Sequence, residues 1–219
     1  MDLPTIRRRY RWLAGIYPAF EVLLALPAGS RGKAVGRLGL SPGGRVLEVG
    51  CGTGRNLGLL RAVVGPEGLV VGVDATPEML EVARTAVREA GWKNVVLIEG
   101  DARSSELPGS VDAILFSLSY SVLPDPLAVL DHVWRSLRPG GTIAILDGQL
   151  PRGRLGTWIR PIVQEISRRT VLGALDRTPE EDLAKRTGSV ERMAIGGGWY
   201  FVVWGRKPLE AGSGGPFGS

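Results

Sequence analysis

Short runs of apolar, largely β-branched residues recur along the middle of the chain and predict buried strands. The five runs span residues 45–49, 69–73, 95–98, 111–116 and 142–146. Stretches with apolar positions at helical spacing separate them. The alternation predicts a mostly parallel sheet with helices on both faces.

Two of the intervening helices have clear starting signals. Thr76 and Asp125 are each followed by proline, the arrangement of an N-cap residue before the first helical position. The second helix is expected to end at residues 138–141, Arg-Pro-Gly-Gly.

After residue 147 the pattern changes. Residues 154–172 mix apolar and basic side chains at helical spacing, and residues 178–181, Thr-Pro-Glu-Glu, predict a capping box that opens a helix. Residues 190–195 and 199–205, separated by three glycines, predict an antiparallel hairpin. The expected fold class is therefore α/β: a Rossmann-like, doubly wound, mostly parallel seven-stranded sheet with a C-terminal antiparallel hairpin.

The amino-acid composition excludes several classes of protein. With 44% apolar and 22% charged residues in 219, the chain fits one globular domain, which excludes collagen and disorder. The single Cys51 and single His132 allow neither an internal disulfide nor a Cys/His zinc cluster, so no metal site is expected. His132 lies off the apolar face of its helix and is expected to be solvated. The apolar run at residues 12–28 contains two prolines and a glutamate, which argues against a signal peptide or a spanning helix.

A glycine-rich turn follows the first predicted strand. Residues 48–54, Glu-Val-Gly-Cys-Gly-Thr-Gly, place a carboxylate two residues before glycines spaced G-x-G-x-G. Glycine permits positive φ and close approach of a ligand to the backbone. A dinucleotide site instead has the spacing G-x-G-x-x-G, with a pyrophosphate at the helix N-terminus. A fixed negative charge beside the turn disfavours pyrophosphate and favours a ligand that carries an ammonium group.

With this motif the chain resembles the class I S-adenosylmethionine-dependent methyltransferases over roughly residues 10–207. Further landmarks of that family recur in order: Asp74 ends the second strand, where a carboxylate can accept from both ribose hydroxyls, and Asp101 ends the third, against the adenine amine. Residues 116–120 end the fourth strand and would face the methyl donor. The resemblance implies S-adenosylmethionine as cofactor. The cofactor-binding residues that it implies are Glu48, Gly50, Cys51, Gly52, Gly54, Asp74, Ala75, Met79, Asp101, Ala102, Ser117, Tyr10 and Tyr17.

The N-terminal segment also resembles part of this family. Tyr10 and Tyr17 lie seven residues apart and match an aromatic pair that folds over the cofactor in many small-molecule, quinone and phospholipid methyltransferases. Arg11 and Pro18 stand where that pattern has aspartates. No catalytic residue is identified; Tyr120 and Tyr17 are the candidates for the acceptor side.

The expected organisation follows from these landmarks. Residues 1–40 form a basic, amphipathic helical segment that covers the active site, and residues 41–208 form the methyltransferase domain. Within that domain, residues 151–189 are a helical insert on the acceptor side. The Gly/Ser-rich residues 209–219 predict a disordered tail.

Charge is divided unevenly along the chain. Lys and Arg outnumber Asp and Glu 27 to 22. Residues 1–40 carry a net +5, residues 41–150 a net −4 and residues 151–219 a net +4. Because the basic flanks are expected on the acceptor side, this division disfavours nucleic acid as a partner and favours an anionic acceptor or membrane surface. A solvated basic face is the alternative.

The sequence therefore predicts an S-adenosylmethionine-dependent methyltransferase with a lipid-like or other small-molecule acceptor. Residues 116–125 and 198–206 resemble, more loosely, bacterial phospholipid and betaine-lipid methyltransferases, so a phospholipid amine head group ranks ahead of a quinone ring. The expected location is the cytoplasm, with peripheral attachment at the inner face of the membrane. The alternatives are a methyltransferase for a soluble metabolite, a non-catalytic cofactor- or lipid-binding module, and an NAD-dependent oxidoreductase, which the glycine spacing disfavours.

Overall fold

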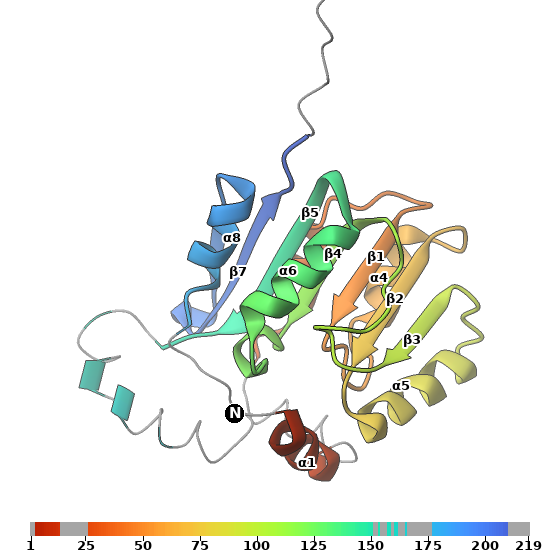
Figure 1. The fold of residues 1–219 in the computed structure, drawn as a ribbon, viewed down its shortest axis with the longest axis horizontal. Coiled ribbons are helices and arrows are strands. Elements are labelled where there is room, and N and C mark those ends of the chain that lie inside the picture. Colours follow the sequence, from red (N-terminus) through yellow and green to blue (C-terminus); the bar gives the residue numbers. More distant parts are fainter. Residues whose placement is uncertain are drawn as a thin grey trace, which may run out of the picture.

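The computed structural model describes residues 3–13, 26–150, 153, 157–158, 160–161, 165 and 177–209. Within this part of the chain, a seven-stranded sheet has the order β3-β2-β1-β4-β5-β7-β6 (Figure 1). The strands are β1 (Arg45–Val49), β2 (Leu69–Asp74), β3 (Val95–Glu99), β4 (Val111–Ser117), β5 (Leu137–Gly148), β6 (Glu191–Ile195) and β7 (Tyr200–Arg206). Strands β1 to β5 run parallel to one another, and β7 runs antiparallel to both β5 and β6. The predicted Rossmann-like α/β fold with a C-terminal hairpin is confirmed.

Helices cover both faces of this sheet. They are α1 (Leu3–Leu13), α3 (Ser30–Gly36), α4 (Leu57–Val64), α5 (Pro77–Glu89), α6 (Pro126–Ser136) and α8 (Pro179–Thr187). Figure 1 shows α6 and α8 on one side of the sheet and α4 on the other. Residues of α6 and α8 share one apolar core with the sheet, and residues of α3, α4 and α5 share a second one. Burial on both faces explains why the central strands are apolar without alternation.

The predicted helix starts are correct, but their capping differs. The Asp125 side chain accepts a hydrogen bond from the Ala128 N–H at 3.0 Å, as an N-cap residue does. Thr76 and Thr178 occupy N-cap positions without a side-chain cap bond. The capping box predicted at residues 178–181 therefore starts α8 at the expected proline but lacks its reciprocal bonds.

The structure differs from the sequence prediction around residue 138. The strand β5 begins at Leu137, five residues before the predicted run at 142–146, because Val111 of β4 pairs with Leu137. Gly140 and Gly141 also exchange backbone hydrogen bonds with Lys207, after β7. The Arg-Pro-Gly-Gly segment thus follows the end of α6, as expected, and is also part of the sheet.

His132 is not simply solvated. Its Nε2 lies 2.9 Å from the Ser105 carbonyl oxygen, so the ring fastens α6 to the loop after β3. Most of residues 154–172, the tail from residue 210, and Tyr17 lie outside the described residues, as does the side chain of Tyr10. The division into residues 1–40 and 41–208 stays a prediction.

Candidate functional site

The glycine turn joins β1 to α4 and has three residues with positive φ: Gly50 (70°), Gly52 (53°) and Gly54 (80°). A Cβ atom at Gly50 would lie 2.6 Å from Ser119 Cβ, and one at Gly54 would lie 2.7 Å from Leu57 Cδ1. A Cβ atom at Gly52 would meet no atom within 4 Å. Close packing therefore requires glycine at positions 50 and 54, whereas the space beside Gly52 is not filled by protein atoms.

That open space is part of a cavity at the carboxyl ends of β1, β2 and β4, the edge where ligands bind in open α/β sheets. The cavity has about 730 Å³ of empty space, its mouth included. Figure 1 shows α1 beyond the end of the sheet to which the arrows of β1 and β4 point. From this helix, Leu3 and Ile6 line the cavity, and Ile6 is buried. The N-terminal helix thus contributes apolar side chains to the wall of the cavity.

Asp74 stands at the end of β2 and lines the cavity. Its two carboxylate oxygens accept from the Gly52 N–H and the Thr76 N–H, both at 2.8 Å. Burial raises the pKa of Asp74 above its ordinary value, although these backbone donors oppose the change. Asp74 therefore fixes the glycine turn and adds a carboxylate to the wall of the cavity.

Glu48 is buried at the end of β1, with 1% of its surface exposed. Oε1 accepts from the Asn56 side-chain amide, whereas Oε2 is buried without a hydrogen-bond partner in the part of the chain that the structure describes. Desolvation raises the pKa of Glu48 to about 7; the Asn56 bond and the Arg31 charge oppose this rise. A buried carboxylate oxygen without a partner costs stability unless a ligand supplies the donor.

Arg31 reaches this cavity from α3. Its Nη1 donates to Asn56 Oδ1 and to Ser117 Oγ, both at 3.1 Å. Ser117 is the last residue of β4 and also lines the cavity. Asn56 therefore accepts from a guanidinium on one side and donates to a carboxylate on the other.

The loop after β4 forms a further part of the cavity wall. Leu118 has a φ of 56°, an uncommon value for a residue with a side chain, and it lines the cavity together with Ser119 and Val122. Such strain persists only where the surroundings hold it, and it is concentrated at functional sites. Here Asp147 accepts from both the N–H and the Oγ of Ser121, which anchors the loop from β5.

Comparisons with known proteins agree on one family. Residues 46–141 match the family model described as a methyltransferase domain. A SAM-dependent methyltransferase from Aquifex aeolicus, known from its crystal structure, has a TM-score of 0.62 and 25% identity, covering 87% of this chain and 98% of that one. The chain contains a class I S-adenosylmethionine-dependent methyltransferase domain.

Two curated relatives of this methyltransferase domain carry a more specific name. The demethylmenaquinone methyltransferase of Lactococcus lactis is 34% identical over 122 residues, which are 55% of this chain and 48% of that protein. The demethylmenaquinone methyltransferase of Listeria welshimeri is 38% identical over 110 residues, 50% of this chain and 47% of that protein. The matched region thus spans about half the length of these relatives.

The cavity of the methyltransferase domain fits S-adenosylmethionine. The cofactor is a nucleoside with a sulfonium and an amino-acid tail, and it supplies an activated methyl group. Gly52 provides a place where backbone can contact it closely, and the buried Oε2 of Glu48 provides an acceptor for an ammonium donor. Most of the predicted cofactor residues line this one cavity. They are Glu48, Gly50, Cys51, Gly52, Asp74, Ala75, Met79 and Ser117.

Cys51 and Met79 contribute shape to the cavity. Burial raises the pKa of the Cys51 thiol well above its usual range, which makes it a poor nucleophile and supports its interpretation as a small filler. Met79 is 2% exposed and lines the cavity from α5. Of the two alternatives open for Met79, contact with the ligand and packing on the sheet, this position permits both.

Three predicted cofactor residues lie elsewhere. Gly54 packs against Leu57 and does not line the cavity. The Asp101 carboxylate forms an ion pair with Arg103, which lowers the pKa of Asp101, and neither Asp101 nor Ala102 is among the described residues that line the cavity. Their contact with adenine stays a prediction.

Tyr120, a candidate for the acceptor side, lies in the core of the described part of the chain. Its side chain is fully buried, packs edge-on against Phe116 with ring centroids 5.4 Å apart, and donates to Asp182 Oδ2 of α8 at 2.8 Å. Burial raises the pKa of the Tyr120 phenol far above its ordinary value. Tyr120 belongs to the apolar core that α6 and α8 share with the sheet, and it is not among the described residues that line the cavity.

Sequence reasoning missed Arg31, Asn56 and the apolar residues of α1. Asn56 stands directly after the glycine turn, so a search of the helix start could have found it. Arg31 lies 17 residues before Glu48 in a segment without a motif, and no local signal marks it.

Proposed function

We propose that this protein transfers the methyl group of S-adenosylmethionine to a lipid-like acceptor, with a reduced quinone ring preferred. The observation that carries the cofactor assignment is the cavity at the glycine turn, where Gly52 leaves open space and where buried Glu48 and half-buried Asp74 line the wall. The names of the curated relatives support the quinone. They reverse the order expected from the sequence, which ranked a phospholipid amine first.

Chemistry restricts the acceptor to the reduced form of the quinone. A sulfonium methyl is electron-poor, so it is attacked by an electron-rich carbon beside a phenol or phenolate, and an oxidised quinone has no such carbon. A carbon–methyl bond forms as the sulfur–methyl bond breaks and leaves its electron pair on sulfur, and the ring carbon then loses its proton to water. The protein has to align the two reactants and exclude water.

The described residues supply an apolar wall for such a ring. Leu3 and Ile6 close the cavity from α1, and Val122, Leu123 and Pro124 line it after β4. An apolar wall suits an aromatic ring better than it suits a charged head group. It also keeps water from the reacting atoms.

The surface charge supports attachment to an anionic membrane. Arg7, Arg8 and Arg11 are exposed on α1, the helix that covers the cavity. Basic residues near an anionic bilayer contribute about 1 kcal/mol each. Attachment of this helix would bring the mouth of the cavity to the surface in which a quinone tail dissolves. Among the described residues, no helix combines the length and the apolarity needed to cross a bilayer.

Transfer of labelled methyl tests the reaction. The purified chain is incubated with methyl-tritiated S-adenosylmethionine and one of three acceptors: a naphthoquinone that lacks its ring methyl, kept reduced by borohydride; phosphatidylethanolamine vesicles; or an aqueous metabolite extract. We expect label in the organic extract with the reduced quinone and none with the same quinone kept oxidised. Label only in the aqueous fraction would support the soluble-metabolite alternative. No label on any acceptor would support a non-catalytic binding module.

Liposome sedimentation tests the membrane part separately. We expect the chain to sediment with phosphatidylglycerol vesicles at low salt and to be released by added salt, because screened charges attract less. Phosphatidylcholine vesicles are the control. Equal partitioning onto both, unchanged by salt, would remove the electrostatic argument.

A further inference from the structure

Arg177 holds the loop after β4 (residues 118–124, the β4 loop) from outside the cavity. It precedes the N-cap of α8, and its Nη1 donates to the Tyr120 carbonyl oxygen at 2.9 Å and to the Leu123 carbonyl oxygen at 2.8 Å. These carbonyls belong to the first residue of a short helix, η1 (Tyr120–Val122), and to the residue that follows it. Arg177 itself is half-buried and is not among the described residues that line the cavity. Its influence on the cavity therefore passes through the β4 loop.

The β4 loop connects the cavity wall to the glycine turn. Five of its residues line the cavity: Leu118, Ser119, Val122, Leu123 and Pro124. The Oγ of Ser119 also donates to the Val49 carbonyl oxygen at 2.6 Å, directly before the glycine turn. A displacement of the β4 loop would therefore change both the wall and the turn.

Asp147 of β5 is a second anchor of the β4 loop. It is 4% exposed and accepts from the N–H and the Oγ of Ser121 at 2.8 and 2.9 Å. Burial raises the pKa of Asp147, whereas its hydrogen bonds and the charge of Arg177 oppose this rise. Arg177 thus binds the loop directly and also favours the ionised form of the carboxylate that binds it from β5.

A strained loop requires such anchors. Leu118 has a φ of 56°, and a conformation of this kind persists only where the surroundings hold it. Hydrogen bonds from a charged donor are stronger than those from a neutral one. We propose that Arg177 is a positioning residue for cofactor binding, which holds the β4 loop in the conformation that lines the cavity. This proposal rests on the cofactor assignment made above.

Calorimetric titration with S-adenosylhomocysteine tests this role. Arg177→Met should raise the dissociation constant about fivefold or more, because only chains with the loop in place bind the ligand. Arg177→Lys should bind more tightly than Arg177→Met, since both bonds of Arg177 come from one nitrogen and an ammonium nitrogen also carries several donors. An arginine that only stabilised the fold would change the fraction of binding-competent chains, and hence the stoichiometry, but not the dissociation constant.

Arg186→Met is the matched control. Arg186 is also half-buried; it donates to the Asp182 carbonyl oxygen and forms an ion pair with Asp131 of α6. Neither partner belongs to the β4 loop. This variant should therefore lower the urea midpoint of unfolding without changing the affinity for S-adenosylhomocysteine.

Hydrogen exchange of the wild-type chain provides a measurement that requires no variant. Adding S-adenosylhomocysteine should slow amide exchange in residues 118–124, which line the cavity, and also in residues 177–183, which include Arg177. Slower exchange in residues 118–124 alone would contradict the link through Arg177.

The outcomes separate this proposal from the cofactor assignment. An unchanged dissociation constant in Arg177→Met, or an equal increase in Arg186→Met, would overturn the role of Arg177 and leave the cofactor assignment intact. If the wild-type chain does not bind S-adenosylhomocysteine, the cofactor assignment fails and this proposal fails with it.

Discussion

Glu48 is placed where it reduces stability. Its carboxyl has a pKa of about 7 in the folded chain and 4.5 as the ordinary value. The folded state therefore holds a proton that the unfolded state has already released between these values, and stability falls as the pH rises from 4.5 through 7. A side chain that destabilises the fold at neutral pH is expected where a ligand needs its charge.

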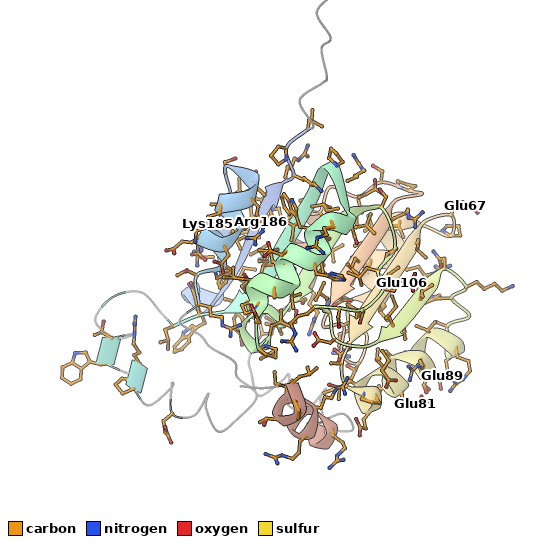
Figure 2. All side chains as sticks on the ribbon, in the orientation of Figure 1. Glu67, Glu81, Glu89, Glu106, Lys185 and Arg186 are labelled. Atoms are coloured by element: carbon orange, nitrogen blue, oxygen red, sulfur yellow. The ribbon has the colours of Figure 1, made fainter. Side chains whose placement is uncertain are left out.

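Replacing Glu48 should therefore stabilise the protein. We expect Glu48→Gln to raise the free energy of unfolding at pH 8 more than at pH 5, by up to about 3 kcal/mol, since one pKa unit corresponds to ~1.4 kcal/mol. Urea unfolding at the two pH values measures this. Glu89→Gln, an exposed carboxylate on α5 labelled in Figure 2, is the control. A gain that does not depend on pH would contradict the buried charge.

The same carboxyl should make cofactor binding depend on pH. An ammonium ligand requires the ionised form of Glu48, so the affinity for S-adenosylhomocysteine should fall roughly tenfold from pH 7.5 to pH 6. Calorimetric titration at several pH values measures the profile, which Glu48→Gln should flatten. A profile that persists in this variant would assign the titration to another group.

Three neighbouring groups influence the pKa of Glu48. Asn56 and Arg31 lower it, and Asp74 raises it. The charge of Glu48 in turn raises the pKa of the Cys51 thiol.

The sequence predicts the positions of some residues of the candidate site but not of others. Asp74 and Glu48 follow from their position at strand ends beside a recognisable turn. Arg31 does not, because only the packing of α3 against the sheet brings it to the cavity. The hydrogen bond of Tyr120 does not follow from the sequence either, because its partner Asp182 lies 62 residues further along the chain.

At the scale of elements, the glycine turn combines two roles that substitution should separate. Gly52→Ala should cost about 1 kcal/mol of stability from its positive φ and abolish S-adenosylhomocysteine binding, because the new methyl would occupy the open space of the cavity. Gly50→Ala should cost about 2 kcal/mol more, because its methyl would overlap Ser119.

Unfolding by urea and titration with S-adenosylhomocysteine measure both effects. Normal binding by Gly52→Ala would show that the ligand does not contact the turn there. Equal stability of the two variants would contradict the packing role assigned to Gly50.

The elements themselves were largely predictable, and the exceptions have physical causes. Buried parallel strands are continuous apolar runs, so five of them and the hairpin could be found from local pattern alone. The start of β5 could not, because it depends on pairing with β4 and on backbone bonds to Lys207 far along the chain. Local signals also located the start of α8 but not the absence of its capping bonds.

At the scale of the whole molecule, the structure shows where the unevenly distributed charges lie. The net −4 of residues 41–150 includes the two carboxylates that line the cavity, whereas the basic excess of the N-terminal flank includes the exposed arginines of α1. The exposed arginines of α1 therefore lie on the helix that covers the cavity, whereas Glu48 and Asp74 line the cavity together with Arg31 and Arg55. The exposed arginines suit an anionic surface outside the cavity.

The central claim is that this cavity binds S-adenosylmethionine through Asp74, and one titration tests it. Asp112 is a matched control, because it also accepts from a backbone N–H, that of Arg45, and stands at the start of β4, away from the cavity. Titrated with S-adenosylhomocysteine, the wild-type chain and Asp112→Ala should bind alike, whereas Asp74→Ala should bind at least tenfold more weakly. No binding by the wild-type chain, or equal binding by Asp74→Ala, would contradict the account.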